Sequence, residues 1–137
     1  MRNVLATFIG FLFASAVVFL FETLIGHNLF PLPEGADAMN MDWIKDNMDK
    51  IPLGSKIFVV VAHFMGIISG MFLAAKISKK SMSPSYIVGA LMLIATFFVI
   101  FALPKELWFA ITDGVLVIIG FFIGKYWAKK QITAPKT

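Results

Sequence analysis

The sequence predicts an all-α membrane protein folded as a bundle of four transmembrane helices. Of the 137 residues, 59% are hydrophobic and only 15% are charged, which is too apolar for a soluble domain of this length. In addition, four mostly apolar runs approach the roughly 20 residues that a helix needs to cross about 30 Å of hydrocarbon. The chain is too short for two domains, so we expect residues 1–137 to form a single membrane domain.

The four predicted spans cover residues 4–25, 57–75, 86–103 and 107–127. The connection between the second and third spans is short, and a tight turn at Pro104, Lys105 and Glu106 joins the third span to the fourth. Only the first connection, residues 27–56, is long enough to hold structure of its own.

A short amphipathic helix is predicted in this first connection. Pro31 and Pro33 favour an extended or turned start, and Asp37 or Asn40 can cap a helix that stops at Pro52. Apolar and acidic residues then fall on nearly opposite faces of this helix. The apolar face carries Met41, Ile44, Met48 and Ile51, and the acidic face carries Asp42, Asp46 and Asp49. We expect the helix to lie on the membrane surface or to cover the bundle.

The acidic face of this helix allows two interpretations. Three carboxylates can hold a divalent cation, since hard cations prefer carboxylate oxygens. The neighbouring Lys45 and Lys50 favour a solvated face instead, because they neutralise the stripe and nothing fixes a coordination geometry. We therefore predict no metal site in this loop.

The distribution of Lys and Arg predicts the orientation, because positive residues stay on the cytoplasmic side of a membrane. One side of the predicted bundle carries basic residues without any acidic one: Arg2, Lys76, Lys79, Lys80, Lys125, Lys129, Lys130 and Lys136. The opposite side carries most of the acidic residues. We predict a multi-pass protein of a bacterial inner membrane with both termini cytoplasmic (N-in/C-in) and the long loop external.

The same asymmetry predicts the partners. The net charge of +4 describes one basic face, so we expect anionic lipid head groups to bind there and expect no nucleic acid partner. Because every copy would insert in the same direction, any homo-oligomer or larger membrane complex should contain parallel copies.

Small residues on three spans predict tight helix packing, since close backbone approach drives helix association in lipid. The second span carries them at four-residue spacing, at Ala62, Gly66, Gly70 and Ala74. The fourth span carries Gly120 and Gly124, and the first carries Ala6, Gly10 and Ala14. The pattern leaves open whether the neighbouring helix belongs to the same chain or to another copy.

Polar residues inside the spans are the candidate site, because ionisable groups at membrane depth are costly. Glu22 is expected about 6 Å, and His63 and Asp113 about 10 Å, inside the external boundary, with Thr96 at a similar level. On a helical wheel His63 shares the glycine face of its span, as Asp113 does. Both should point into packed protein. Glu22 lies about 120° from the small-residue face of the first span and should reach toward water.

Two roles of this cluster remain open. Two carboxylates flanking an imidazole, which titrates near neutral pH, can bind a proton, a cation or a cationic solute. Alternatively, Asp113, His63 and Thr96 form a buried hydrogen-bond network that fixes helix register, with Glu22 at the interface beside His27 or Lys56.

The residue inventory argues against an enzyme and against a cofactor. The chain has no cysteine and only two histidines, so thiolate and iron-sulfur sites are excluded and few strong metal ligands remain. The HExxH, GxSxG, P-loop and GxGxxG motifs are also missing. We predict no catalytic residue, no bound metal and no cofactor.

Several segments resemble a family of small bacterial four-helix membrane proteins. The resemblance rests on His27 and on residues 30–37, 52–54, 62–76 and 104–109, and it spans nearly the whole chain. It implies the four-span topology and a bacterial inner membrane, but it supplies no activity, ligand or catalytic residue to carry over. The chain is also similar in size and helix number to small multidrug transporters, which have a membrane-embedded glutamate on their first helix.

Together these observations predict a non-enzymatic inner-membrane protein that acts through packing, as an interaction module or a complex subunit. The alternative is a small proton- or cation-linked transporter or channel that uses Glu22, His63 and Asp113. The match to small multidrug transporters is poor, because Glu22 lies at the end of its span and the long acidic loop is foreign to them.

Overall fold

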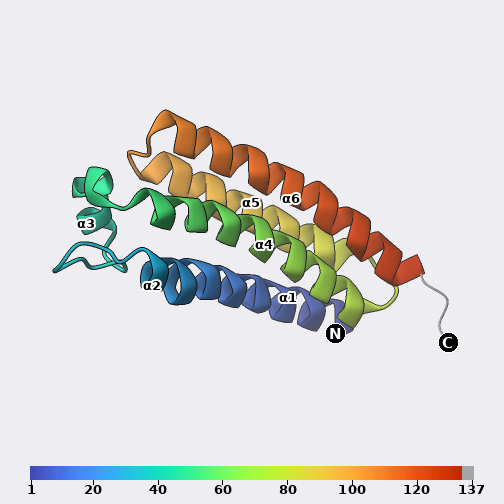
Figure 1. Cartoon of the computed structure of the whole chain (residues 1–137). Coiled ribbons are helices and arrows are strands. Elements are labelled where there is room, and N and C mark those ends of the chain that lie inside the picture. The colour runs from blue at the N-terminus through green and yellow to red at the C-terminus, as the bar shows by residue number, and fades with distance from the viewer. Residues whose placement is uncertain (134–137) are drawn as a thin grey trace.

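The computed structural model describes residues 1–133, and within this part the chain is helical and contains no β-strand (Figure 1). Lys136, assigned above to the basic face, lies outside the described residues. Four helical segments are long and apolar enough to cross a membrane, as the sequence predicts. The first, Arg2–Leu29, consists of α1 (Arg2–Phe19), the π-helix η1 (Leu20–Gly26) and α2 (His27–Leu29). The others are α4 (Leu53–Ser78), α5 (Ser83–Ala102) and α6 (Leu107–Thr133).

Helix α4 is the centre of the bundle and contacts α1, α5 and α6 (Figure 1). In an apolar stretch of 18 residues, 50% of the residues of α4 are buried inside the bundle, whereas only 17% are buried in the corresponding stretch of the first span. The core cluster accordingly contains Ile67, Met71 and Ala74 of α4, with Val88 of α5 and Val117 of α6 packed against them. The outward surfaces of the other helices are rich in large apolar side chains such as those expected to face lipid.

The small-residue faces of α1 and α4 pack against each other within one chain. A Cβ added to Gly70 would lie 2.6 Å from Ala14 Cβ and 2.9 Å from the Gly10 carbonyl oxygen. Gly66 approaches Ala14 and Val18 in the same way, and Ala62 and Ala74 are fully buried. The two backbones therefore approach too closely for any larger residue at these positions.

Helix α6 uses its own glycines against the other side of α4. A Cβ on Gly120 would meet Ile67 Cγ2 at 2.7 Å, and one on Gly124 would meet Met71 Sδ at 2.9 Å. Figure 1 shows α1 and α6 on either side of α4, so the small residues of these two helices pack against one central helix.

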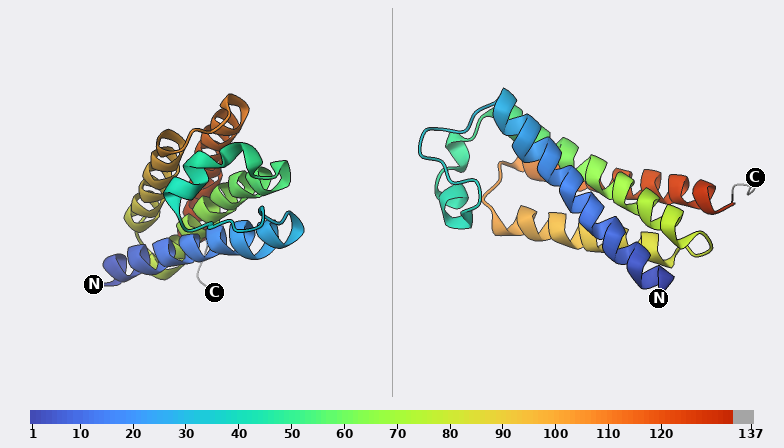
Figure 2. Two further views of the ribbon diagram at one scale, coloured as in Figure 1. Left: turned by 90° about the vertical axis from the view of Figure 1, so that its left-hand side faces the viewer. Right: turned by 90° about the horizontal axis from the view of Figure 1, so that it is seen from below.

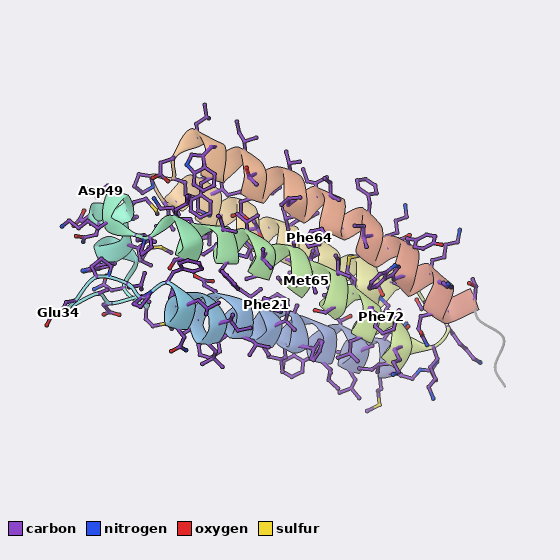
Figure 3. The ribbon with its side chains drawn as sticks, viewed as in Figure 1. Phe21, Glu34, Asp49, Phe64, Met65 and Phe72 are labelled. Atoms are coloured by element: carbon purple, nitrogen blue, oxygen red, sulfur yellow. The ribbon has the colours of Figure 1, made fainter. Side chains whose placement is uncertain are left out.

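The bundle has two chemically different ends. At one end, which we call the loop end, lies the connection between α2 and α4, and the two turned views show this connection folded over the ends of the helices (Figure 2). Two of its acidic side chains, Glu34 and Asp49, point away from the helices (Figure 3). At the other end, which we call the basic end, α1 begins, α4 turns into α5 and α6 finishes (Figure 1).

The connection at the loop end contains α3 (Met41–Asp46) and a 3-10 turn, η2 (Met48–Lys50). The Asn40 side chain accepts hydrogen bonds from the backbone of Asp42 and Trp43 and so caps α3. The helix ends well before Pro52, because the Asn47 side chain donates to the Trp43 carbonyl and the Asn47 backbone leaves helical geometry. Met48 packs with Val60 and Phe109 of the bundle, and Ile44 and Ile51 pack around them, which holds the connection against the helix ends.

Candidate functional site

A buried network of three side chains lies between α4 and α6 near the loop end. His63 Nδ1 is 2.8 Å from one carboxylate oxygen of Asp113, and Lys105 Nζ is 2.8 Å from the other. Asp113 is fully buried, and the side chains of His63 and Lys105 are 11% and 2% exposed. Both carboxylate oxygens of Asp113 are therefore occupied, and the negative charge is matched by a buried ammonium.

Lys105 is the member of this network that the sequence analysis missed, because its position in the turn before α6 indicated a solvent-exposed loop residue. Its ammonium instead reaches Asp113 in the second turn of α6, and it also lies 4.2 Å from the centre of the Phe109 ring. Phe109 is buried and shields the ion pair from solvent. A signal was present in the spacing, since Lys105 and Asp113 are eight residues apart and a buried carboxylate needs a cation within reach.

The geometry assigns the proton of His63. Asp113 pairs with the Lys105 ammonium as a carboxylate, and a carboxylate can only accept hydrogen bonds. His63 Nδ1 therefore carries the proton and donates the hydrogen bond to Asp113. With Nδ1 carrying the proton, the neutral form of the ring has Nε2 as a hydrogen-bond acceptor on its other edge.

Thr96 does not belong to the network, contrary to the hydrogen-bonded triad considered from the sequence. It is 1% exposed, yet its hydroxyl has no hydrogen-bond partner among the described residues. It lines, with His63, a cavity of about 290 Å³ between α1, α4 and α5.

Glu22 is turned toward the bundle by the π-helix η1. The His27 N–H donates to the Glu22 carbonyl oxygen five residues back, which is the hydrogen bond of a π-helix. This wider turn rotates each residue by less than the roughly 100° of an α-helix. Glu22 therefore moves from the outward direction predicted above toward the small-residue face of α1. It is half-buried and lines the cavity that contains Thr96 and His63.

A second cavity, of about 210 Å³, lies between the loop and the ends of the helices. It adjoins the first, because Glu22, His27, Ala38, His63 and Val99 line both. The apolar side chains of α3 and η2 form its cover. Ser55, at the start of α4, donates to the Phe30 carbonyl at 2.7 Å and ties the loop to the bundle beside the cavity.

Another ion pair closes this end. Lys56, whose side chain is 6% exposed, donates to Glu106 of the turn before α6. The sequence analysis considered Lys56 as a neighbour of Glu22, but the structure pairs it with Glu106. Glu22 itself has no hydrogen bond or ion pair through its carboxylate within residues 1–133.

The site thus divides into two chemically different parts. The network of Lys105, Asp113 and His63 is closed on itself. The side-chain oxygens of Glu22 and Thr96 have no partner among the described residues, and both residues line the cavity together with His63. Within the part of the chain that the structure describes, no three His, Asp or Glu side chains are grouped as metal ligands.

Comparisons with protein families, with curated proteins and with solved structures find no match for this chain. The resemblance to small bacterial four-helix proteins therefore stays a prediction from the sequence.

Proposed function

We propose that this chain is a non-enzymatic, multi-pass protein of a bacterial inner membrane that acts through packing, as an interaction module or a subunit of a membrane complex. The observation that carries this proposal is the closed network around Asp113. A membrane carboxylate that bound a transported cation would have to be accessible, whereas both oxygens of Asp113 hold buried partners of the same chain. The network is suited to holding α4 and α6 in register.

The second candidate function is a small proton- or cation-linked transporter. The observation that favours it is the pair of adjoining cavities lined by Glu22 and His63. In this alternative Glu22 would carry the exchangeable charge, and Asp113 would only orient His63. The two functions therefore differ in whether a solute crosses the membrane.

Two measurements on one preparation distinguish them. In native mass spectrometry, protein extracted with its native lipids should have a mass above that of one chain. An interaction module is expected to stay bound to a partner or to a second parallel copy. In liposomes under an imposed proton or monovalent-cation gradient, the same protein should give no flux above empty liposomes. A single chain in the native mass spectrum would contradict the module, and flux that Glu22→Gln abolishes would establish the transporter.

The proposed orientation places the basic end in the cytoplasm, and what supports it is the location of the charges. Seven basic residues belong to the basic end by the bounds of the helices: Arg2 begins α1, Lys76, Lys79 and Lys80 lie at the end of α4 and in the turn after it, and Lys125, Lys129 and Lys130 lie in the last turns of α6. Acidic residues are concentrated in the connection at the loop end. Anionic lipid head groups are the partner that this end would attract, at about 1 kcal/mol per basic residue near the surface.

The orientation is tested by labelling single cysteines, since the native chain has none. In intact cells, a cysteine at Asp37 should react with a membrane-impermeant thiol reagent, because Asp37 is in the loop proposed to face outward. A cysteine at Ser81, between α4 and α5, should react only after lysis. Reaction at Ser81 in intact cells, with protection at Asp37, would reverse the proposed orientation.

A further inference from the structure

The cavity between α1, α4 and α5 has a set of polar groups that the rest of the fold does not use. Thr96 is the clearest of them, because a hydroxyl that is 1% exposed and has no partner among residues 1–133 is expensive to bury. Such a group usually has a partner in its working state. Since Thr96 lines the cavity, that partner would occupy the cavity.

Two further acceptors lie in the wall of the same cavity. His63 donates through Nδ1 to Asp113, so in the neutral ring the other nitrogen, Nε2, is an acceptor. Glu22 adds a carboxylate without an ion-pair partner in the described residues, and the π-helix is the feature that brings it there. Single π-helical turns occur frequently at functional sites. The cavity therefore offers acceptors from α4 and η1, together with a hydroxyl from α5.

The remaining wall is mostly apolar, with Ser15, Thr23 and His27 as its other polar residues. Phe11 and Val18 of α1 and Met92 and Val99 of α5 are among the side chains that form it. Among the residues that line this cavity, Glu22 is the only Asp, Glu, Lys or Arg. The two nearest buried lysines are paired elsewhere, Lys56 with Glu106 and Lys105 with Asp113. The net charge offered to an occupant is thus the negative charge of Glu22.

The geometry points to a binding site for a primary ammonium on an apolar stem. An ammonium has three N–H donors and a positive charge, which match Glu22, His63 Nε2 and Thr96. An apolar stem matches the apolar side chains of α1 and α5 in the wall. An anion would meet the carboxylate of Glu22, and no Lys or Arg lines this cavity to hold it. A neutral alcohol could use the hydroxyl and the imidazole but would leave the carboxylate charge uncompensated.

Two sources can supply this chemistry, namely a free amphipathic amine or the head group of an aminophospholipid. The site goes beyond the proposed function, since an interaction module can hold a ligand without transporting it. Amine binding is measured in an experiment separate from the native mass and the flux that test the proposed function. The ammonium site can therefore fail while the interaction module stands, and the reverse.

The test is calorimetric titration of octylamine into the full chain in phosphatidylcholine nanodiscs, with partition into empty discs subtracted. We expect saturable binding of one amine per chain, with octanol about tenfold weaker or worse because it lacks the charge. Glu22→Gln should weaken amine binding about tenfold, and Thr96→Val about two- to tenfold. Thr96→Val should not lower the melting temperature, because it removes an unsatisfied hydroxyl and keeps the shape of the side chain.

Matched controls separate the site from general effects of these substitutions. Thr7→Val removes a hydroxyl of α1 that donates to the Asn3 carbonyl outside both cavities, and Glu34→Gln removes a carboxylate of the loop that points away from the bundle (Figure 3). Both variants should bind octylamine like the parent. No saturable binding, or binding that Glu22→Gln and Thr96→Val leave unchanged, would overturn the inference.

A second lipid composition identifies the source of the ligand. If the head group of a lipid is the natural occupant, discs that also contain phosphatidylethanolamine should weaken octylamine binding by competition. If the natural occupant is a free amine, binding should be the same in both kinds of disc. Either result supports an ammonium site, provided that octylamine binds in the phosphatidylcholine discs.

Discussion

Replacing Asp113 by Asn should destabilise the folded protein by about 3–5 kcal/mol, because it leaves the ammonium of Lys105 buried without a counter-charge. The amide keeps the shape of the side chain and can still accept from His63 Nδ1, so the effect comes from the ion pair. Reversible unfolding of the purified protein in mixed micelles, followed by circular dichroism, measures this loss. Considered from the sequence alone, the same substitution would cost only the ~0.6 kcal/mol that membrane hydrogen bonds average.

A second variant keeps this prediction specific. Combining Lys105→Met with Asp113→Asn removes both charges and preserves the hydrogen bond to His63, so most of the stability should return. Lys105→Met alone should be strongly destabilising, since it leaves the buried carboxylate with only an imidazole. If Asp113→Asn and the double variant unfold alike, then Lys105 is solvated in the protein and the closed network does not exist.

The spans could be predicted from the sequence because their signal is local. A run of apolar residues of sufficient length needs no knowledge of its neighbours, and the four predicted spans correspond to helical segments in the structure. The positions of His63 and Asp113 on the glycine faces of their helices also follow from helical periodicity alone. The structure places these two side chains in contact.

The remaining features depend on contacts or on backbone geometry that no periodic pattern contains. Lys105 was assigned to a turn because its backbone is there, but a lysine side chain is long enough to place its charge elsewhere. The π-helix η1 changes the direction of Glu22 without any sequence signal that we can identify. Thr96 was expected in a hydrogen-bond network because of its depth, but depth does not determine which groups are within bonding distance.

Replacing Gly70 by Leu should prevent α1 from docking on α4 and should lower the free energy of unfolding by about 3 kcal/mol or more. Even the first atom of the new side chain would lie 2.6 Å from Ala14 Cβ and 2.9 Å from the Gly10 carbonyl oxygen. Neither atom belongs to a flexible side chain, so the contact can be relieved only by separating the helices. Separation also removes the reciprocal contact between Gly10 and Ala74. Thermal unfolding in detergent should show the loss.

A pair of alanine substitutions isolates the packing contribution from that of helix propensity. Alanine favours a helix over glycine by up to about 1 kcal/mol at either position, so propensity alone predicts stabilisation. At Gly114 of α6 an added Cβ would be 3.5 Å from its nearest neighbour, Phe97, which is an ordinary contact, and Gly114→Ala should be neutral or stabilising. Gly70→Ala should instead destabilise by about 1–3 kcal/mol because the clash outweighs propensity. Equal melting temperatures for the two alanine variants would mean that α1 does not pack on α4 through this face, and α1 would then be free to pack against a partner or a second copy through its small residues.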